Sequence, residues 1–486
     1  MRKLLAALVV SALATGVAQA QTAPSEAAVR AATEGYARLN EGNPDAAIEA
    51  ARRAVEAAPG FLDYRLLLAD ALLRAGRNRE AYVALEPVAD LSDYRVQSRR
   101  AQAAAGAGLK TEAAAAFGLA AGLATEPESR AYLTRAHIQA LLEINDPAGA
   151  RTAFDTAMLN GVLTGQAPLD TAMVAIAVRD DAAAQAAFAE AGQSEPLSGR
   201  MALDAGYSAR RLGRDADALR YFSRGIDEVE AGRLDLEPQQ VFEIRREIST
   251  LERRWGASAT ISRGVASTDS AATPGAETLT QFGAEAHYRL GGYRNGAPVD
   301  LFVRAYETLD ADGGSATGSE TAQGWIGLRW KPFTGTNLVL EASKMFAIGE
   351  LARDDLMLRA SWSLDQGGDL RLDRASWPSW RLYGDVAHIV DDDQTLGVAE
   401  ARTGWSWRAG DRGVITPFIG IRGYYDSLLT DSVAVGVGPG LSVRRWFGAN
   451  RYAAPSSYIE GTIGYGFSLS GDDRGDGLFV ALSINY

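Results

Sequence analysis

The chain has 486 residues, a formal net charge of −12 and no cysteine, and hydrophobic residues make up 47% of it. This length allows two substantial domains. The lack of cysteine excludes disulfides, thiolate metal sites, a cysteine nucleophile and a lipid-modified cysteine anchor. The negative charge argues against nucleic acid as a partner, because phosphate binding requires a basic surface.

Residues 1–20 have the pattern of a secretory signal peptide. Arg2 and Lys3 form a charged start, residues 4–13 an apolar core, and residues 18–20 a small-residue cleavage motif. We expect cleavage after Ala20, the alternative being an uncleaved membrane anchor. Beyond this segment, no apolar run approaches the length of a transmembrane helix.

Residues 21–234 are Ala-rich and repeat at a period of 34. An alanine recurs five positions after a turn glycine: Gly42 and Ala47, Gly76 and Ala81, Gly108 and Ala113, and Gly213 and Ala218. The steps from Ala150 to Ala184 and from Ala184 to Ala218 are also 34 residues. The pattern resembles the tetratricopeptide repeat, in which small residues let the two helices of a hairpin cross closely and stacked hairpins leave a concave surface. We expect about six copies between residues 27 and 233, the third and fifth being degenerate. A generic Ala-rich bundle is the alternative.

Residues 235–256 predict a capping helix that links the repeats to a second domain. Leu251, Arg254 and Trp255 lie at the end of this segment. An amphipathic tryptophan is typical of a membrane interface, so we expect the helix to end there.

Residues 257–486 change to Gly, aromatic and β-branched residues with alternating polarity, which predicts strands. The closing segment GLFVALSINY is the clearest: one face carries Leu478, Val480, Leu482, Ile484 and Tyr486. A final strand of this kind resembles the signal read by the outer-membrane barrel assembly machinery, with Tyr486 as its last residue. The strand pattern recurs about twelve times.

Such alternation predicts an antiparallel transmembrane β-barrel, since its apolar face would meet lipid and its polar face a wet lumen. Closure removes the strand edges that hydrocarbon cannot tolerate. A soluble barrel or sandwich is the alternative. Aromatic residues near strand ends are expected to form interfacial girdles: Trp377, Trp380, Trp405, Trp407, Tyr424, Tyr425 and Trp446.

Successive side chains of a strand point to opposite faces, so the parity of its position assigns each residue to the polar or the apolar face. Eleven charged residues fall on the polar face in this way and are the candidate lumen-lining binding residues: Glu285, Arg289, Arg304, Arg329, Glu341, Arg359, Glu400, Arg402, Arg422, Arg444 and Glu460. They either line a path for a polar polymer or solute, or pair across strands and plug the lumen. The parity of the sequence leaves both interpretations open.

The sequence contains no recognisable catalytic motif, so we expect a non-enzymatic protein without cofactor or metal. The three histidines, His137, His287 and His388, lack metal-ligand spacing, and no nucleophile elbow or P-loop occurs. The glycines of GVGPG are interpreted as inward positions kept small, and the Arg-Gly-Asp at residues 474–476 as chance. Aspartate clusters in the expected outer loops are interpreted as solvated tips, calcium binding being the alternative.

From about residue 250 onward, the chain resembles the C-terminal domain of bacteriophage adsorption protein A, NfrA. The resemblance rests on RRWGASATISRG, GWIGLRWKPF, WPSWRLYGDVAHIVDDD, VAEARTGWSWRAG, ITPFIGIRGYYD and GLFVALSINY. In layout, the chain is also similar to outer-membrane exopolysaccharide exporters. The resemblance implies export of an exopolysaccharide made by an inner-membrane glycosyltransferase complex, and possible use as a receptor by a phage tail protein.

The sequence therefore predicts an outer-membrane protein with a periplasmic repeat domain and a barrel embedded in lipid. The main hypothesis is a polysaccharide exporter, in which the repeats bind the polymer or the synthase and the barrel is the conduit. The alternative is a surface receptor or scaffold with a plugged barrel as its anchor. An enzyme in the barrel would have to use His287 or His388, and neither has a visible nucleophile partner.

Overall fold

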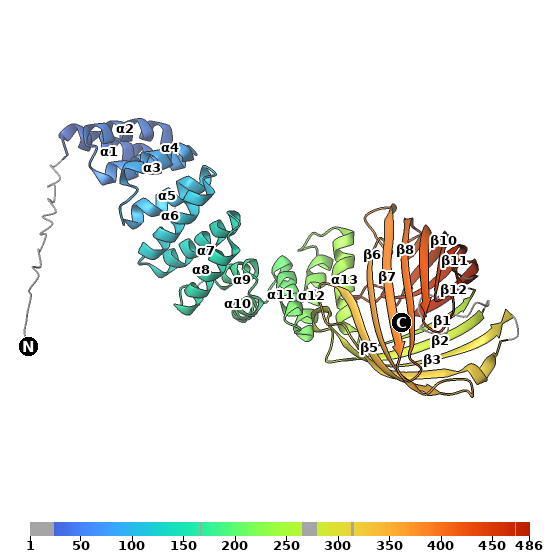
Figure 1. Ribbon diagram of the computed structural model, residues 1–486. Helices are drawn as coiled ribbons and strands as arrows, with labels where there is room; N and C mark the ends of the chain where they lie inside the picture. Colours follow the sequence, from blue (N-terminus) through green and yellow to red (C-terminus); the bar gives the residue numbers. More distant parts are fainter. Residues whose placement is uncertain (1–23, 166, 265–278, 313–314, 472) are drawn as a thin grey trace, which may run out of the picture. The chain divides into compact units, whose positions relative to one another are not determined.

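The computed structural model describes residues 24–165, 167–264, 279–312, 315–471 and 473–486. The expected signal peptide with its cleavage at Ala20, and one of the expected outer loops, at about residues 266–278, lie outside the described residues. Figure 1 shows a helical region followed by a barrel. The two-part fold class, helical repeats and then an antiparallel barrel, is confirmed.

Thirteen α-helices occupy the described part of the helical region. None of them is long and apolar enough to cross a bilayer. Their bounds are α1 (Glu26–Asn40), α2 (Pro44–Ala57), α3 (Leu62–Arg74), α4 (Asn78–Ala84), α5 (Tyr94–Gly106), α6 (Lys110–Leu123), α7 (Pro127–Glu143), α8 (Pro147–Leu159), α9 (Pro168–Ala177), α10 (Asp181–Ser194), α11 (Gly199–Arg211), α12 (Asp215–Glu230) and α13 (Pro238–Glu252).

The first twelve helices follow one another as six pairs, each with a left-handed residue in the turn between its two helices. Four of the turns use a glycine, and the fourth and fifth use Asn145 and Arg179, with φ of 60° and 61°. The third pair, expected to be degenerate, keeps its turn at Gly108, where φ is 74°. Five positions after each turn residue stands a buried alanine: Ala47, Ala81, Ala113, Ala150, Ala184 and Ala218.

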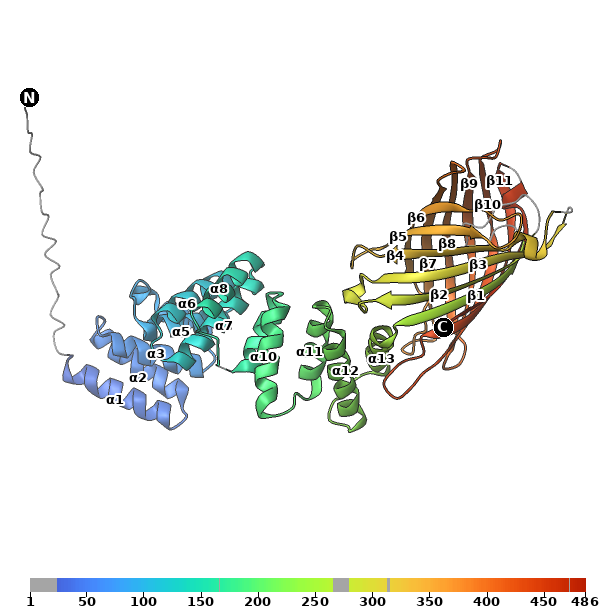
Figure 2. The same ribbon diagram turned by 90° about the horizontal axis from the view of Figure 1, so that it is seen from below.

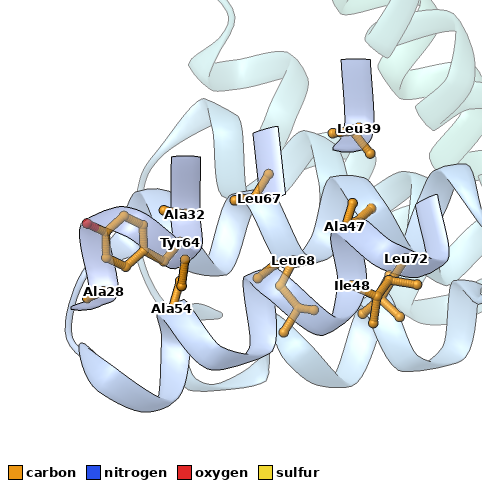
Figure 3. Packing of buried hydrophobic residues seen from close by; sticks show 14 of the residues in the cluster. Ala28, Ala32, Leu39, Ala47, Ile48, Ala54, Tyr64, Leu67, Leu68 and Leu72 are labelled. Atoms are coloured by element: carbon orange, nitrogen blue, oxygen red, sulfur yellow. The ribbon is translucent and has the colours of Figure 1, made fainter. Parts of the chain in front are cut away.

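Close helix crossings explain the small residues. A Cβ added at Gly35 of α1 would come within 2.9 Å of Leu67 in α3, and one at Gly206 of α11 within 2.7 Å of the Phe222 ring in α12. Figure 3 shows the first core, in which alanines of α1 and α2 face leucines of α3. Larger residues at these positions would push the helices apart.

The chain divides into two compact units after Asp180, inside the helical region rather than at the change from helix to strand. In the first unit, α1 contacts α3, α3 contacts α5 and α7 contacts α9. First helices of successive hairpins thus contact one another from α1 to α5 and again at α7 and α9, as expected for stacked repeats.

In the described residues, twelve antiparallel strands form a closed barrel in which each strand pairs with its sequence neighbours and β1 pairs with β12. The Ala257 N–H donates to the Tyr486 carbonyl at 3.0 Å, and the Tyr486 N–H donates to the Ala257 carbonyl at 2.8 Å. The strands are β1 (Trp255–Arg263), β2 (Leu279–Leu290), β3 (Val299–Ala311), β4 (Gln323–Trp330), β5 (Asn337–Ala347), β6 (Asp355–Gln366), β7 (Ser376–Ile389), β8 (Gln394–Arg408), β9 (Gly413–Asp426), β10 (Val433–Phe447), β11 (Ser457–Ser470) and β12 (Gly477–Asn485).

The outside of the barrel is apolar and exposed, as the alternation predicts. Three of the seven aromatic residues assigned to girdles face inward instead: Trp377, Tyr424 and Trp446 are only 2%, 6% and 5% exposed. The girdle assignment is therefore wrong for these three. Trp405, Trp407 and Tyr425 do lie on the exposed face.

Helix α13 packs against the barrel end where β1 begins, which we call the near end (Figure 2). There Phe242 is buried with Trp377 and Trp446, which lie on the inward faces of β7 and β10. Ser249 Oγ donates to the Ala454 carbonyl at 2.6 Å, and Arg246 pairs with Asp369 at 3.0 Å.

The turns of the near end carry their own charge pairs. A hydrogen bond from Arg371 lowers the pKa of Asp373 to about 2, so the turn between β6 and β7 keeps this ion pair through ordinary pH. The turn between β10 and β11 contacts α12, where Arg451 pairs with Asp227 and Glu230. Near-end turns thus hold the last two helices.

Candidate functional site in the barrel lumen

All eleven charged residues singled out by parity lie at inward positions of the strands, and their side chains are largely shielded from solvent. Ten of them belong to two clusters, distinguished by their partners: a first cluster of Glu285, Arg304, Arg329, Glu341 and Arg359, and a second of Glu400, Arg402, Arg422, Arg444 and Glu460. Arg289 lies apart from both and pairs with Asp300 at 3.3 Å.

Four members of the first cluster, on β2, β3, β4 and β5, form a closed ion-pair network. Arg304 Nη2 donates to Glu285 Oε2 at 2.7 Å, and its Nη1 donates to Glu341 Oε1 at 3.1 Å. Arg329 Nη2 donates to Glu285 Oε2 at 2.7 Å. Both guanidinium groups lie over the Phe302 ring. Charges buried in this way are retained only when they are paired, so this cluster stiffens the wall.

Arg359 extends the same side of the lumen. Its Nε donates to Asp385 Oδ2 at 2.7 Å, and the Tyr383 hydroxyl donates to the same oxygen at 3.1 Å. An inward apolar cluster adjoins these ion pairs, with members on β3 to β8: Phe302, Trp325, Met345, Met357, Ala387, Ile389 and Leu396. This side of the lumen is therefore filled.

The opposite wall, on β10 and β11, is kept small by glycine. A Cβ at Gly436 or Gly466 would collide with the carbonyl of Gly475 in the turn before β12. In the same turn Arg474 is 1% exposed and donates to the Asp431 carbonyl. The inward glycines thus make room for backbone, and Arg474 is not presented to solvent as an adhesion motif would require.

The second cluster surrounds open space. A cavity of about 260 Å³ is lined by Arg381, Arg402, Arg422, Arg444 and Glu460. A cavity of about 250 Å³ shares Arg381, Arg402, Arg444 and Glu460 with it. Together they reach the size of small-ligand pockets, about 300–1,000 Å³.

Two glutamates balance part of this positive charge. Arg422 Nε donates to Glu400 Oε2 at 2.7 Å, and Arg444 Nη2 donates to Glu460 Oε2 at 2.7 Å. Glu460 also accepts from Ser442 Oγ at 2.5 Å. The arrangement presents guanidinium donors and carboxylate acceptors to the open space.

The three histidines each lie beside a different partner. His137 contacts the Ala114 carbonyl, His388 contacts Thr395 Oγ1, and His287 lies 4.0 Å from Glu285. Within the described ranges, no three His, Asp or Glu residues gather in a way that could hold a metal ion.

Sequence reasoning missed Arg381, which lines both cavities, and Asp385, the partner of Arg359. Both stand on inward positions of β7, so the parity that selected the other eleven applies to them equally. It also missed Phe418, which lines the second of the two cavities and lies under the guanidinium of Arg402 at 5.0 Å. An aromatic ring on the polar face departs from the alternation, so Phe418 was not selected. Its contact with Arg402 is seen only in the folded barrel.

Two parts of the chain match known families. Residues 314–482 match the family described as Bacteriophage N adsorption protein A C-term. Residues 38–102 match the tetratricopeptide repeat. No curated protein matches the chain significantly.

Several solved structures are similar to part of the chain. A tetratricopeptide repeat protein from Parabacteroides merdae has 14% identity and a TM-score of 0.34, over 46% of this chain and 86% of that one. Pseudomonas aeruginosa pilF has 20% identity and a TM-score of 0.31, over 43% and 93%. YrrB, a tetratricopeptide repeat protein, has 17% identity and a TM-score of 0.32, over 37% and 92%.

The two family matches agree with the order of the folded parts. The repeat match lies within α1 to α5, and the other match runs from the segment before β4 into β12. Behind helical hairpins that match the tetratricopeptide repeat, the chain therefore carries a barrel of which residues 314–482 match the C-terminal domain of bacteriophage N adsorption protein A.

Proposed function

We propose that the chain is an outer-membrane protein that passes an exopolysaccharide across the membrane, with its repeats binding the periplasmic polymer or the synthase that makes it. Repeats joined to a barrel form the architecture of a scaffold or structural protein rather than of an enzyme. The barrel family and the exposed apolar strand faces support the membrane location, because lipid is the solvent that such a surface requires.

The single observation that carries the conduit role is the arginine-lined space in the lumen. A polar polymer needs a hydrated path with groups that bind weakly at several points, and the second charged cluster offers such groups. Its cavities are lined by residues of β6 to β12 and of β1. The polymer would therefore pass beside these residues, since the interior around Phe302, Trp325 and Met357 is filled.

The repeats supply a surface for a partner. On neighbouring first helices, Asp63 and Asp70 of α3 pair with Arg95 and Arg99 of α5 at 2.9 and 2.6 Å. Burial and the nearby Asp63 and Asp70 raise the pKa of Tyr36 in α1. This row of Tyr, Asp and Arg offers ring faces and charge-assisted hydrogen bonds, which suit either a saccharide or a protein segment.

Deleting the gene while the synthase stays intact tests the export role. We expect the polymer to collect in the periplasm and to disappear from the cell surface. Complementation with the full chain should restore the surface polymer. Normal surface polysaccharide in the deletion strain would refute the proposal.

A second candidate is a surface receptor or scaffold with the barrel as its anchor. The observation in its favour is the filled lumen: the first ion-pair network, the apolar cluster beside it and Arg474 all occupy interior space. The family name adds the possibility that a phage adsorbs to the outer loops. Planar-bilayer recordings of the purified chain separate the candidates, because a plugged anchor gives no conductance.

A further inference from the structure

Four arginines of the lumen are held in fixed orientations by aromatic rings. Each guanidinium carbon lies over a ring: for three of them the ring is on the same or a neighbouring strand, and for Arg422 on β9 it is on β12. The pairs are Arg381 over Tyr383 at 5.1 Å, Arg402 over Phe418 at 5.0 Å, Arg422 over Phe479 at 4.4 Å and Arg444 over Tyr458 at 4.4 Å. Stacking of this kind leaves the guanidinium edge free to donate, and it reduces the entropy lost on binding.

The four cations exceed the carboxylates that pair with them. Arg422 and Arg444 each have a glutamate at 2.7 Å, whereas Arg402 lies 3.6 Å from Glu400, the same carboxylate that Arg422 uses. For Arg381 the described residues provide no carboxylate within 4 Å; Asp365, its partner in the β6–β7 register, lines the adjoining cavity without forming an ion pair. Shielded arginines normally have a carboxylate partner, so these two have donor capacity to spare.

The rest of the lining is rich in neutral hydrogen-bonding groups. Beside Glu460 and Arg263, it includes side chains on β1, β11 and β12: Thr260, Ser262, Thr462, Ser483 and Asn485. Hydroxyl and amide groups both donate and accept, as do sugar hydroxyls. The cavity thus combines anion-binding groups with groups suited to a saccharide ring.

We propose that this cavity binds the acidic groups of a saccharide, and that the polymer handled by the barrel is an acidic polysaccharide bearing carboxylates. The inference rests on the proposed export function and names its substrate class. Arg381 and Arg402 would bind the carboxylate through bidentate hydrogen bonds, which a planar guanidinium forms with two oxygens. The neutral residues of the lining would bind the sugar hydroxyls.

Calorimetric titration of the full chain in detergent tests the assignment. The probes are a hexamer of galacturonic acid, a neutral glucose hexamer and inorganic phosphate. The variants are R381Q/R402Q, the charge-conserving R381K/R402K, and R412Q, which changes an exposed turn arginine at the near end. Circular dichroism confirms that each variant keeps its strands.

We expect the acidic hexamer to bind at least about tenfold more tightly than the neutral one, and R381Q/R402Q to lose about tenfold or more of that affinity. R412Q should bind as the parent does, and R381K/R402K should keep part of the affinity through its charge. Added salt should weaken binding of the acidic hexamer.

Equal affinity for the acidic and neutral hexamers would overturn the assignment, as would full affinity in R381Q/R402Q. Phosphate binding as tightly as the acidic hexamer would overturn it too, because the site would then serve a free anion. Bilayer conductance is recorded on the same samples. A conducting chain without preference for the acidic hexamer would refute this inference and leave the export proposal standing, whereas a chain that neither conducts nor binds a hexamer would contradict both.

Discussion

Arg304 is held between two carboxylates inside the barrel. Its side chain is 6% exposed, and those of Glu285 and Glu341 are 15% and 3% exposed. Replacing a charge in such a network leaves its partners desolvated and unpaired, which is more unfavourable than losing the ion pair itself. Each buried charge of the network is therefore stabilised only while its partners are present.

We expect Arg304→Ala to lower the free energy of unfolding of the barrel by about 3–5 kcal/mol. Urea unfolding of the full chain in detergent, followed by tryptophan fluorescence, measures the change. Arg263→Ala is the matched control. Arg263 pairs with Asp310 at the same 2.7 Å, but the two side chains are 47% and 62% exposed, so its loss should change stability by less than about 1 kcal/mol. Equal effects of the two substitutions would contradict the proposed stiffening role.

Arg179 occupies a turn position that four of the six hairpins give to glycine. Its φ is 61°, in the left-handed region where a Cβ is strained. Arg179→Gly should therefore raise the free energy of unfolding by about 0.5–1 kcal/mol, after allowance for the greater freedom of glycine in the unfolded chain.

Thermal melting followed by far-UV circular dichroism measures this change. Gly76→Ala is the reverse control, because Gly76 has a φ of 72° and no atom within 4 Å of an added Cβ, so strain alone should lower the melting temperature. A lower melting temperature for Arg179→Gly would contradict this prediction, because it would show that the exposed arginine side chain stabilises the hairpin by more than the strain of its backbone.

Helix α13 connects the repeats to the barrel through side chains whose roles could not be read from the chain locally. The position of Trp377 and Trp446 near strand ends suggests a membrane girdle, although the alternation of β7 and β10 places them on the inward face with Arg381 and Arg444. Phe242, more than 130 positions earlier than Trp377, is the residue with which both are buried. Pairing over such a distance leaves no periodic signal, whereas strands and repeats do.

We expect Phe242→Ala to loosen α13 from the near end, since removal of a buried phenylalanine lowers stability by about 3–5 kcal/mol. Hydrogen exchange should increase at Ala454, whose N–H donates to the Arg245 carbonyl at 3.0 Å, and throughout the turn between β10 and β11. Leu159→Ala is the control, because that side chain is 87% exposed. Unchanged exchange in the Phe242 variant would show that the polar contacts alone hold the helix.

At the scale of the whole molecule, the division after Asp180 separates α1 to α9 from everything that follows. Repeats contact only their neighbours, so stability is shared locally rather than across the chain. Residues 24–180, produced alone, should therefore be helical and unfold cooperatively, and the full chain should show a separate transition for each unit. Calorimetry measures both, and a single transition in the full chain would contradict the division.

The sequence by itself determined which elements form and which side chains face the lumen. A period of 34 with small residues at the crossings defines the hairpins, and a period of two sorts Glu285, Arg304 and their counterparts inward, because both patterns are local consequences of backbone geometry. The number of strands and their closure followed from the same alternation.

Only the tertiary structure decided what those inward charges do. Parity treats Glu341 and Arg402 alike, yet one is enclosed by two arginines and the other lies beside an open cavity with a shared carboxylate. The difference arises because a closed barrel brings together strands far apart in sequence, and an ion pair depends on distance in space. For the same reason Phe242 and Trp377 had to be seen folded before either could be assigned its role.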